Sequence, residues 1–249
     1  MRHDKMLEFT RATKSFGGVK AVNECSFSIK PRVVTALIGP NGAGKTTVFN
    51  LACGLLKPDS GSITLAGTEI TNLAPEAIAL LGVARTFQQP RLFENLTVLE
   101  NVLLAADSND GSFWKNFVGA NRVTPAKEET ARKALSLAGM QLHEDALCRE
   151  LSYGQKKLVE LARSLAKPHQ LLLLDEPVAG VNPKLRASTT RILERLRAEK
   201  KTILLTEHDL QFALGIADDV IVMDEGCVIA QGAPPAIKRN EKVLEAYLG

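Results

Sequence analysis

The chain has 249 residues, of which 45% are hydrophobic and 24% charged, and this balance excludes a disordered, fibrous or collagen-like protein. The length predicts one large α/β domain with room for a subdomain. Lys and Arg number 31 against 28 Asp and Glu, and so small an excess argues against a dedicated nucleic-acid-binding protein.

The apolar runs are short, and one of the longest, residues 77–84, contains a glycine. A membrane-spanning helix needs ~20 mainly apolar residues, and no apolar stretch follows the basic N-terminus, so we expect neither a spanning helix nor a signal peptide. The cysteines lack the spacing of a zinc site, which predicts isolated buried thiols in a reducing cytosol. They are Cys25, Cys53, Cys148 and Cys227. The sequence therefore predicts a cytosolic chain, which leaves open work at a membrane through a partner.

Two kinds of strand are expected. Residues 7–30 alternate weakly and are rich in β-forming residues, which predicts an antiparallel sheet. Segments 61–67 and 226–232 each indicate a strand between glycine turns. Continuous apolar runs indicate strands that are buried on both faces of a parallel sheet. These runs are residues 33–38, 171–174, 202–205 and 220–223. Helical patterns lie between them, so the chain is expected to have an α/β fold.

One part of the chain has helical patterns but no run of the buried-strand type. Residues 90–150 contain the patterns 98–106 and 125–138. We therefore predict a helical subdomain at 90–150, inserted into an α/β core formed by residues 1–89 and 151–249. The aromatic residues of the intervening stretch 107–124 are expected to cover this subdomain, with a partner contact as the alternative. They are Phe113, Trp114 and Phe117.

A glycine-rich loop follows the apolar run 33–38 and precedes the helical pattern 47–55. Its residues are Gly39, Pro40, Asn41, Gly42, Ala43, Gly44, Lys45, Thr46 and Thr47. The pattern G-x-x-x-x-G-K-[ST] between a strand and a helix is typical of a phosphate-binding loop. Backbone N–H groups and the helix N-terminus attract phosphate oxygens, Lys45 adds a full charge, and Thr46 offers a hydroxyl to Mg²⁺.

Acidic residues follow the apolar run 171–174, at the strand end where ligands bind in open α/β sheets. Asp175 is expected to lie on the metal side, and Glu176 to polarise the water that attacks the γ-phosphate. His208 follows the run 202–205 in the same way. Beside a phosphate loop and an acid pair, we favour a γ-phosphate contact for His208 over a purely structural role.

The segment from Ser152 to Gln155 precedes the helical pattern that Pro168 ends. Ser152 and Gln155 have the spacing of a capping box, so a well-capped helix is one interpretation. The other is an anion site made of the Ser152 hydroxyl, the Gly154 N–H and the helix N-terminus. A phosphate loop with a second anion site elsewhere suggests that two chains enclose the nucleotide between them.

These motifs and their order along the chain closely resemble those of the ATP-binding subunit of ABC transporters. The resemblance covers essentially the whole chain. The resemblance implies a P-loop NTPase core of the RecA-like type with an antiparallel β subdomain and an inserted helical subdomain. It implies that Phe16 stacks on adenine and that Gln88 forms the Q-loop, which contributes to hydrolysis and to the metal site. Residues 151–155 match the family signature, residues 179–182 its D-loop, and His208 its switch histidine.

Finer details resemble the subunit that powers import of branched-chain amino acids. They include residues 85–89, Tyr153 and the terminal residues 246–249. The resemblance implies ATP and Mg²⁺ as ligands and a second ATPase subunit, identical or homologous, as a partner. It also implies two membrane permeases, an indirect link to a periplasmic binding protein, and a place on the cytoplasmic face of the inner membrane. Residues 89–100, with Arg91, Leu92 and Phe93, are expected to contact the permease, or else to pack inside the helical subdomain.

Several alternatives stay open at this point. Related subunits serve urea and amide importers or lipopolysaccharide exporters, so the cargo is not determined. Tyr153 and Asn182 replace the more common Gly and Asp, which leaves open whether both ATP sites of a pair turn over equally. A non-transport ABC ATPase or a small-molecule kinase would use the same phosphate loop, but a kinase needs no signature segment.

Overall fold

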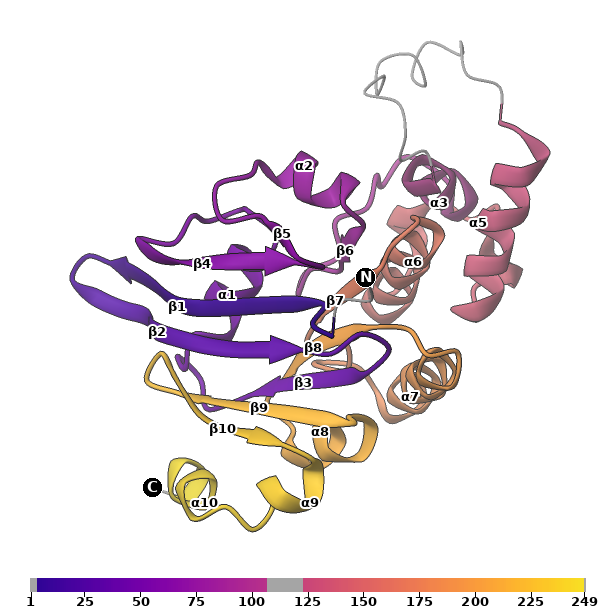
Figure 1. Cartoon of the computed structure of the whole chain (residues 1–249). Helices are drawn as coiled ribbons and strands as arrows, with labels where there is room; N and C mark the ends of the chain where they lie inside the picture. Colours follow the sequence, from indigo (N-terminus) through magenta and orange to yellow (C-terminus); the bar gives the residue numbers. More distant parts are fainter. Residues whose placement is uncertain (1–3, 107–122, 249) are drawn as a thin grey trace. The chain divides into compact units, whose positions relative to one another are not determined.

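The computed structural model describes residues 4–106 and 123–248 (Figure 1). Contacts between Cα atoms divide the chain into two compact units, which we describe one at a time. The first unit contains residues 1–85, 170–179 and 193–249, and the second contains residues 86–169 and 180–192. The helical unit is therefore larger than the predicted subdomain at 90–150.

The first unit contains two β-sheets. The four-stranded sheet is antiparallel, in the order β2 (Val19–Ile29), β1 (Leu7–Phe16), β4 (Ser60–Leu65), β5 (Thr68–Glu69). The six-stranded sheet has the order β10 (Cys227–Gly232), β9 (Asp219–Asp224), β3 (Val34–Ile38), β8 (Ile203–Glu207), β7 (Leu171–Asp175), β6 (Val83–Arg85). Its strands are parallel except β10, which pairs antiparallel with β9.

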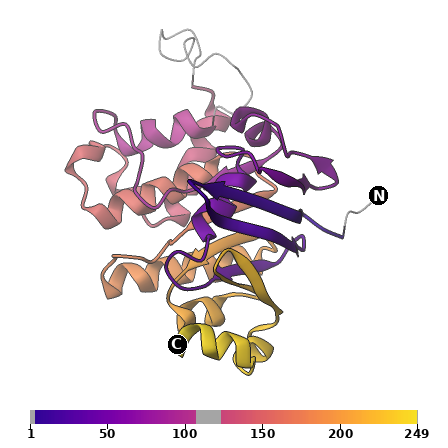
Figure 2. The same cartoon turned by 90° about the vertical axis from the view of Figure 1, so that its left-hand side faces the viewer.

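Three helices of the first unit lie between strands along the chain: α1 (Lys45–Ala52), α2 (Pro75–Leu80) and α8 (Leu210–Ile216). Helices α9 (Pro234–Ile237) and α10 (Glu241–Leu248) follow the last strand, β10. Helix α7 (Pro183–Ala198) begins in the second unit and ends in the first. Helices α9 and α10 contact strand β10, and Figures 1 and 2 both show them beside it.

The four continuous apolar runs form strands of the parallel part of the six-stranded sheet, as predicted. Every residue of β3, β7 and β8 is buried, because packing covers both faces of these strands. Strand β6 was not predicted, since a pairing segment of three residues has too little periodicity to be recognised. Segments 61–67 and 226–232 resemble each other in sequence, but they contribute β4 and β10 to different sheets.

The core of the first unit unites the antiparallel sheet, helix α1 and one face of the parallel sheet. On β7, Leu171 and Leu173 belong to this cluster, whereas Leu172 and Leu174 are buried on the opposite face. From β1 and β2, Phe9 and Phe27 stack with ring centroids 4.6 Å apart. Stacking and burial of large rings make this pair a strong contributor to stability.

The second unit is built of helices. They are α3 (Val98–Ala106), α5 (Pro125–Leu137), the short 3₁₀ helices η1 (Gln141–His143) and η2 (Cys148–Glu150), α6 (Tyr153–Ala166) and the first part of α7. Helix α6 packs against both α3 and α5, which corrects its predicted assignment to the α/β core. Helices α3 and α5 lie where the patterns predict them. Phe113, Trp114 and Phe117, whose role was predicted, lie outside the described residues.

Two further expectations concern membranes and thiols. In the part of the chain that the structure describes, none of the helices is both long and apolar enough to span a bilayer. Cys25, Cys53 and Cys148 are buried free thiols, as expected, whereas Cys227 is only half-buried. Burial raises the pKa of Cys25 to about 11, so its thiol is protonated at neutral pH.

Two phenylalanines of strand β1 provide a matched test of this core. Phe9 is 1% exposed and Phe16 is 47% exposed. Phe9→Ala should lower the free energy of unfolding by ~3–5 kcal/mol, because it removes a buried ring and leaves a cavity. Phe16→Ala should change it by less than ~1 kcal/mol. Urea denaturation of both variants measures the difference, and equal losses would contradict the assignment of Phe9 to the core.

Candidate functional site

The glycine-rich loop leaves strand β3 and ends at the first turn of α1. Gly39 and Gly44 have φ angles of 155° and 99°. A Cβ atom would lie 2.1 Å from the carbonyl oxygen of Met223 at Gly39, and 2.2 Å from that of Ala21 at Gly44. Only glycine fits such close approaches of backbone to backbone. The loop conformation therefore depends on neighbouring strands as well as on its own residues.

The side chain of Lys45 turns back over this loop. Its Nζ donates hydrogen bonds to the carbonyl oxygens of Gly39 at 2.7 Å and Pro40 at 2.9 Å. Burial lowers the pKa of Lys45, while the nearby carboxylates of Glu176 and Asp175 oppose that effect. The ammonium group is therefore held among carbonyl dipoles and close to two acids. Of the other predicted loop residues, Asn41, Gly42 and Thr46 are exposed.

Asp175 ends strand β7 as a buried carboxylate with partners on both oxygens. Its Oδ2 accepts from Nη2 of Arg85 at 2.9 Å, and its Oδ1 accepts from Oγ1 of Thr206 at 2.9 Å. The Arg85 and Asp175 side chains are only 8% and 7% exposed. Arg85 also donates to Oδ1 of Asn50 in α1 at 2.8 Å. These contacts connect α1 with strands β6, β7 and β8.

Glu176 has a φ angle of 47°, in the left-handed region that non-glycine residues rarely adopt. Its backbone N–H donates to Oγ1 of Thr206 at 3.1 Å. The same hydroxyl thus accepts from Glu176 and donates to Asp175. A residue in this conformation costs ~1–3 kcal/mol and persists where surrounding contacts impose it, often at functional sites.

The end of strand β8 places His208 at the surface. The residue before it, Glu207, is completely buried and accepts from the backbone N–H of Val178 at 3.2 Å. The residue after it, Asp209, caps α8 by accepting from the N–H of Phe212 at 2.9 Å. His208 is thus an exposed side chain between two residues that fix the backbone.

Phe16 lies at the end of strand β1, in the hairpin that leads to β2. The residue is 47% exposed, and Nζ of Lys14 lies 5.8 Å from the ring centroid. An exposed ring of this kind is accessible for stacking. The first unit therefore contains Phe16, the glycine-rich loop, Asp175, Glu176 and His208.

The second unit contains the remaining predicted residues. Ser152 caps helix α6, accepting from the N–H of Gln155 at 3.3 Å, while Oε1 of Gln155 accepts from the N–H of Ser152 at 3.0 Å. The predicted capping box is therefore confirmed. Ser152 is nevertheless exposed, and Gly154 lies in the first helical turn, so this helix N-terminus is accessible. Gln88 is also exposed, and its carbonyl oxygen accepts from the hydroxyl of Tyr153 at 3.1 Å.

Sequence reasoning missed the residues that support these side chains. Thr206 and Arg85 support Asp175, and Glu160 of α6 accepts from the N–H groups of Phe87 and Arg91, on either side of Gln88. A signal existed for Glu160, because it is an acidic residue on the apolar side of a helical pattern. Arg85 and Thr206 gave a weaker signal, as polar residues at the ends of apolar strands.

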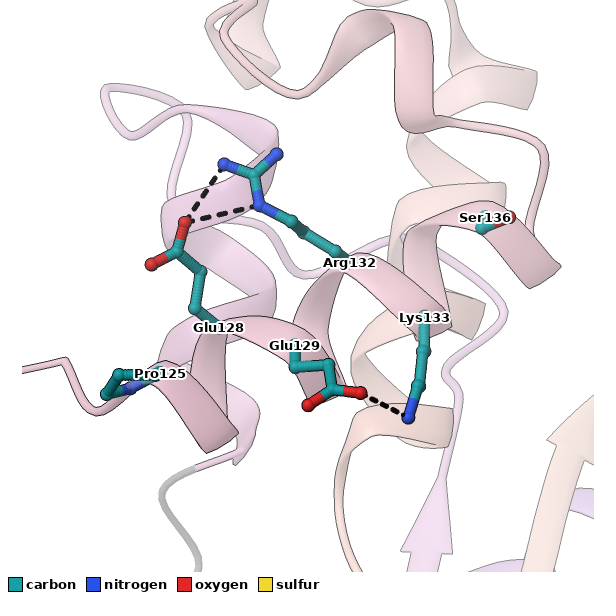
Figure 3. Close-up of a pocket in the computed structure, with 6 residues that line it drawn as sticks. All are labelled: Pro125, Glu128, Glu129, Arg132, Lys133 and Ser136. Carbon is teal, nitrogen blue, oxygen red and sulfur yellow. Dashed lines mark hydrogen bonds and ion pairs between the residues drawn. The ribbon is translucent and has the colours of Figure 1, made fainter.

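A separate hollow lies along helix α5 (Figure 3). Its lining residues are Pro125, Glu128, Glu129, Arg132, Lys133 and Ser136. The charged side chains pair along the helix, Glu128 with Arg132 at 3.0 Å and Glu129 with Lys133 at 2.7 Å. Because these opposite charges compensate one another at (i, i+4) spacing, the hollow is a solvated helix surface.

Known proteins share both the motifs and the fold. A family model described as "ABC transporter" matches residues 22–179, and one described as "Branched-chain amino acid ATP-binding cassette transporter" matches residues 227–249. The chain therefore belongs to the ATP-binding subunits of ABC transporters, and it is an ATP-binding cassette ATPase with a P-loop NTPase core.

Curated relatives of similar length carry branched-chain amino acid transport in their names. The "High-affinity branched-chain amino acid transport ATP-binding protein BraF" of Pseudomonas aeruginosa is 39% identical over 98% of each chain. Its counterpart LivG of Escherichia coli is 38% identical over 94% of each chain. Among solved structures, a nucleotide-free ATP-binding cassette from an ABC transporter superposes with a TM-score of 0.84 at 33% identity, covering 98% of this chain and 99% of its own. The ADP conformation of the cassette MJ1267 also has a TM-score of 0.84, at 34% identity and the same coverage.

Thr206 offers a test of the site that sequence motifs did not suggest. Thr206→Val keeps the shape but removes the hydroxyl that contacts both Asp175 and Glu176. We expect ATP hydrolysis to fall at least ~10-fold, because a lost hydrogen bond to a charged group costs ~1.5–3 kcal/mol. Thr206→Ser, which keeps the hydroxyl, should stay within a few fold of wild type. Steady-state rates of ATP hydrolysis by both variants test the role of the hydroxyl. Equal rates for Thr206→Val and Thr206→Ser would contradict that role.

The buried carboxyl of Glu160 predicts a pH dependence of stability. Burial raises its pKa to about 7, although the N–H groups of Phe87 and Arg91 and the charges of Arg163 and Lys157 oppose the rise. Between the ordinary pKa and pH 7 the folded chain binds more protons than the unfolded chain, so stability falls as pH rises through this window. The free energy of unfolding of wild type relative to Glu160→Gln should therefore fall by ~2–3 kcal/mol from pH 5 to pH 8.

Urea denaturation of both proteins at several pH values measures this difference. The comparison cancels the other groups that titrate in the same range, since the two chains share them. A constant difference across the range would mean that Glu160 titrates at its ordinary pKa.

Proposed function

We propose that this chain hydrolyses ATP to drive the import of branched-chain amino acids through an ABC transporter. The observation that carries the proposal is the phosphate loop, over which Lys45 turns back to donate to the Gly39 and Pro40 carbonyl oxygens. Asp175 and Glu176 belong to the same unit, at the end of strand β7. The names of the relatives support the cargo.

In this proposal the first unit binds the nucleotide. The N–H groups of residues 39–47 and the N-terminus of α1 contact the phosphates. Lys45 leaves its carbonyl partners, Gly39 and Pro40, for the more strongly charged β- and γ-phosphates. Phe16, whose ring is exposed, stacks on the adenine.

The oxygen groups of this unit suit Mg²⁺, which prefers oxygen ligands and retains water. The Thr46 hydroxyl would bind the ion directly. Asp175 would act through water, because Arg85 and Thr206 already contact its two oxygens. Gln88, the Q-loop residue, would supply a further oxygen. When bound, Mg²⁺ neutralises charge that develops on the β- and γ-phosphates.

Hydrolysis is assigned to Glu176. Its carboxylate accepts a proton from the water whose oxygen attacks the γ-phosphorus, and ADP departs with the bridging oxygen. His208 donates a hydrogen bond to the γ-phosphate. Thr206 supports this arrangement, because its hydroxyl fixes the backbone N–H of Glu176.

The signature segment is proposed to serve a nucleotide held by a second ATPase subunit, identical or homologous. Gly154 and Gln155 lie in the first turn of a 14-residue helix that Ser152 caps, and the N-terminus of a helix favours anions. Ser152 is exposed there although its hydroxyl also caps the helix. The closed pair would thus enclose ATP between a phosphate loop and a signature.

Residues 89–100 are proposed to contact the permeases, which would hold the chain at the cytoplasmic face of the inner membrane. Phe93 is 42% exposed and Leu92 is half-buried. An exposed aromatic residue beside arginine is typical of a small interaction hot spot. This exposure favours a permease contact over the alternative of core packing. A periplasmic binding protein would deliver the amino acid from the other side.

Glu176→Gln tests the ATPase role and the paired arrangement together. The amide fills the same space but cannot accept the proton, so ATP binding should persist while turnover falls ~10²–10⁴-fold. ATP should then stabilise a dimer that light scattering detects. Glu245→Gln, an exposed change on α10, is the matched control and should behave like wild type. A variant that stays monomeric with ATP would favour the kinase alternative.

A test of the proposed cargo requires the assembled transporter. We expect leucine, isoleucine or valine with their binding protein to raise ATP hydrolysis by the complex in proteoliposomes. Urea and acetamide serve as competing candidates in the same assay. Stimulation by an amide alone would replace the proposed cargo and leave the ATPase assignment intact.

A further inference from the structure

One face of helix α6 contacts the irregular segment 86–94, which carries Gln88. The hydroxyl of Tyr153 donates to the Gln88 carbonyl oxygen at 3.1 Å. One turn further on, Nζ of Lys156 lies 2.8 Å from Oε1 of Glu94. Two turns on, Oε1 of Glu160 accepts from the N–H groups of Phe87 at 3.2 Å and Arg91 at 3.4 Å.

The same face continues at Arg163. Its guanidinium donates to the carbonyl oxygen of Arg91 and lies 5.8 Å from the ring centroid of Phe93. Residues 153, 156, 160 and 163 recur at intervals of three and four, so they lie in one row on the helix. The row begins next to Ser152, at the signature end of the helix.

Glu160 is the most enclosed member of this row, at 5% exposure. The segment that it contacts forms neither helix nor strand, so its backbone N–H groups need other acceptors. A single carboxylate oxygen meets this need on both sides of Gln88. The other end of the contact region is Phe93, which is exposed and therefore accessible to a partner.

We propose that Glu160 is a positioning residue, which fixes the backbone from Gln88 to Phe93 to the helix that begins at Ser152. The signature end, the Q-loop residue and the exposed aromatic then move together. A role of Glu160 in coupling ATP hydrolysis to transport rests on the proposed function. Its role in holding the segment 88–93 against helix α6 does not. The length of the Glu160 side chain is the property that matters, because the N–H groups of Phe87 and Arg91 need an acceptor oxygen that extends far enough from the helix.

Two variants distinguish the effect of side-chain length from the effect of charge. Glu160→Gln keeps the length and an acceptor oxygen but loses the charge, whereas Glu160→Asp keeps the charge and is shorter by one methylene. Positioning predicts that Gln is tolerated and Asp is impaired. A role of the charge alone predicts the reverse order. Leu135→Ala in α5 is the control, because it weakens the core of the same unit from another helix.

The first measurement is amide hydrogen exchange on the full chain, which needs no cargo or permease. The amides of Phe87 and Arg91 should exchange at least ~10-fold faster in Glu160→Asp than in wild type, since their acceptor is lost. In Glu160→Gln they should exchange within ~3-fold of wild type. The proposal would be overturned if exchange at these two amides were unchanged in Glu160→Asp, or if it were accelerated equally in Glu160→Gln and Glu160→Asp.

The second measurement is substrate-stimulated ATP hydrolysis by the complete transporter. Glu160→Asp should lower kcat at least ~5-fold with the KM for ATP within ~2-fold, because the phosphate loop is untouched. Leu135→Ala should lower the melting temperature without this change in kcat. If wild type shows no stimulation while the exchange result holds, the proposed function fails and the positioning role stands. If stimulation is normal in Glu160→Asp, the coupling role of Glu160 is wrong.

Discussion

The first unit depends on one buried acidic side chain, Asp175, which is only 7% exposed. Burying such a group without partners costs free energy, so its two oxygens need hydrogen-bond partners with good geometry. Arg85 and Thr206 provide them from the neighbouring strands, and Asp175 and Thr206 are paired in the parallel register of β7 and β8. Correct strand register is thus a condition for the chemistry, since a slip by one residue would turn these side chains to the opposite face.

The same requirement for neighbours governs the phosphate loop. Gly39 and Gly44 press against the carbonyl groups of Met223 and Ala21, which belong to β9 and β2. Both sheets therefore shape the loop, and the core beneath them keeps it in place. Burial lowers the pKa of Lys45, and the carbonyl oxygens and two acids around it partly offset the cost of burying its charge.

The second unit uses one helix for two purposes. The N-terminus of α6 presents the signature residues, while its side chains from Tyr153 to Arg163 contact the segment that contains Gln88. A helix is suited to this because its side chains keep fixed spacing over several turns.

The sequence by itself determined what depends on neighbours along the chain. The phosphate loop, the capping box at Ser152, the helices near 98–106 and 125–138 and the doubly buried strands all follow from local patterns, and the structure contains them. Only the tertiary structure decided that β6 pairs with β7, that α6 belongs with α3 and α5, and that Arg85, Thr206 and Glu160 support the site. The reason is distance along the chain: these contacts join residues 90, 31 and 73 positions apart, and no local periodicity encodes which polar residue will meet which across a packed interior.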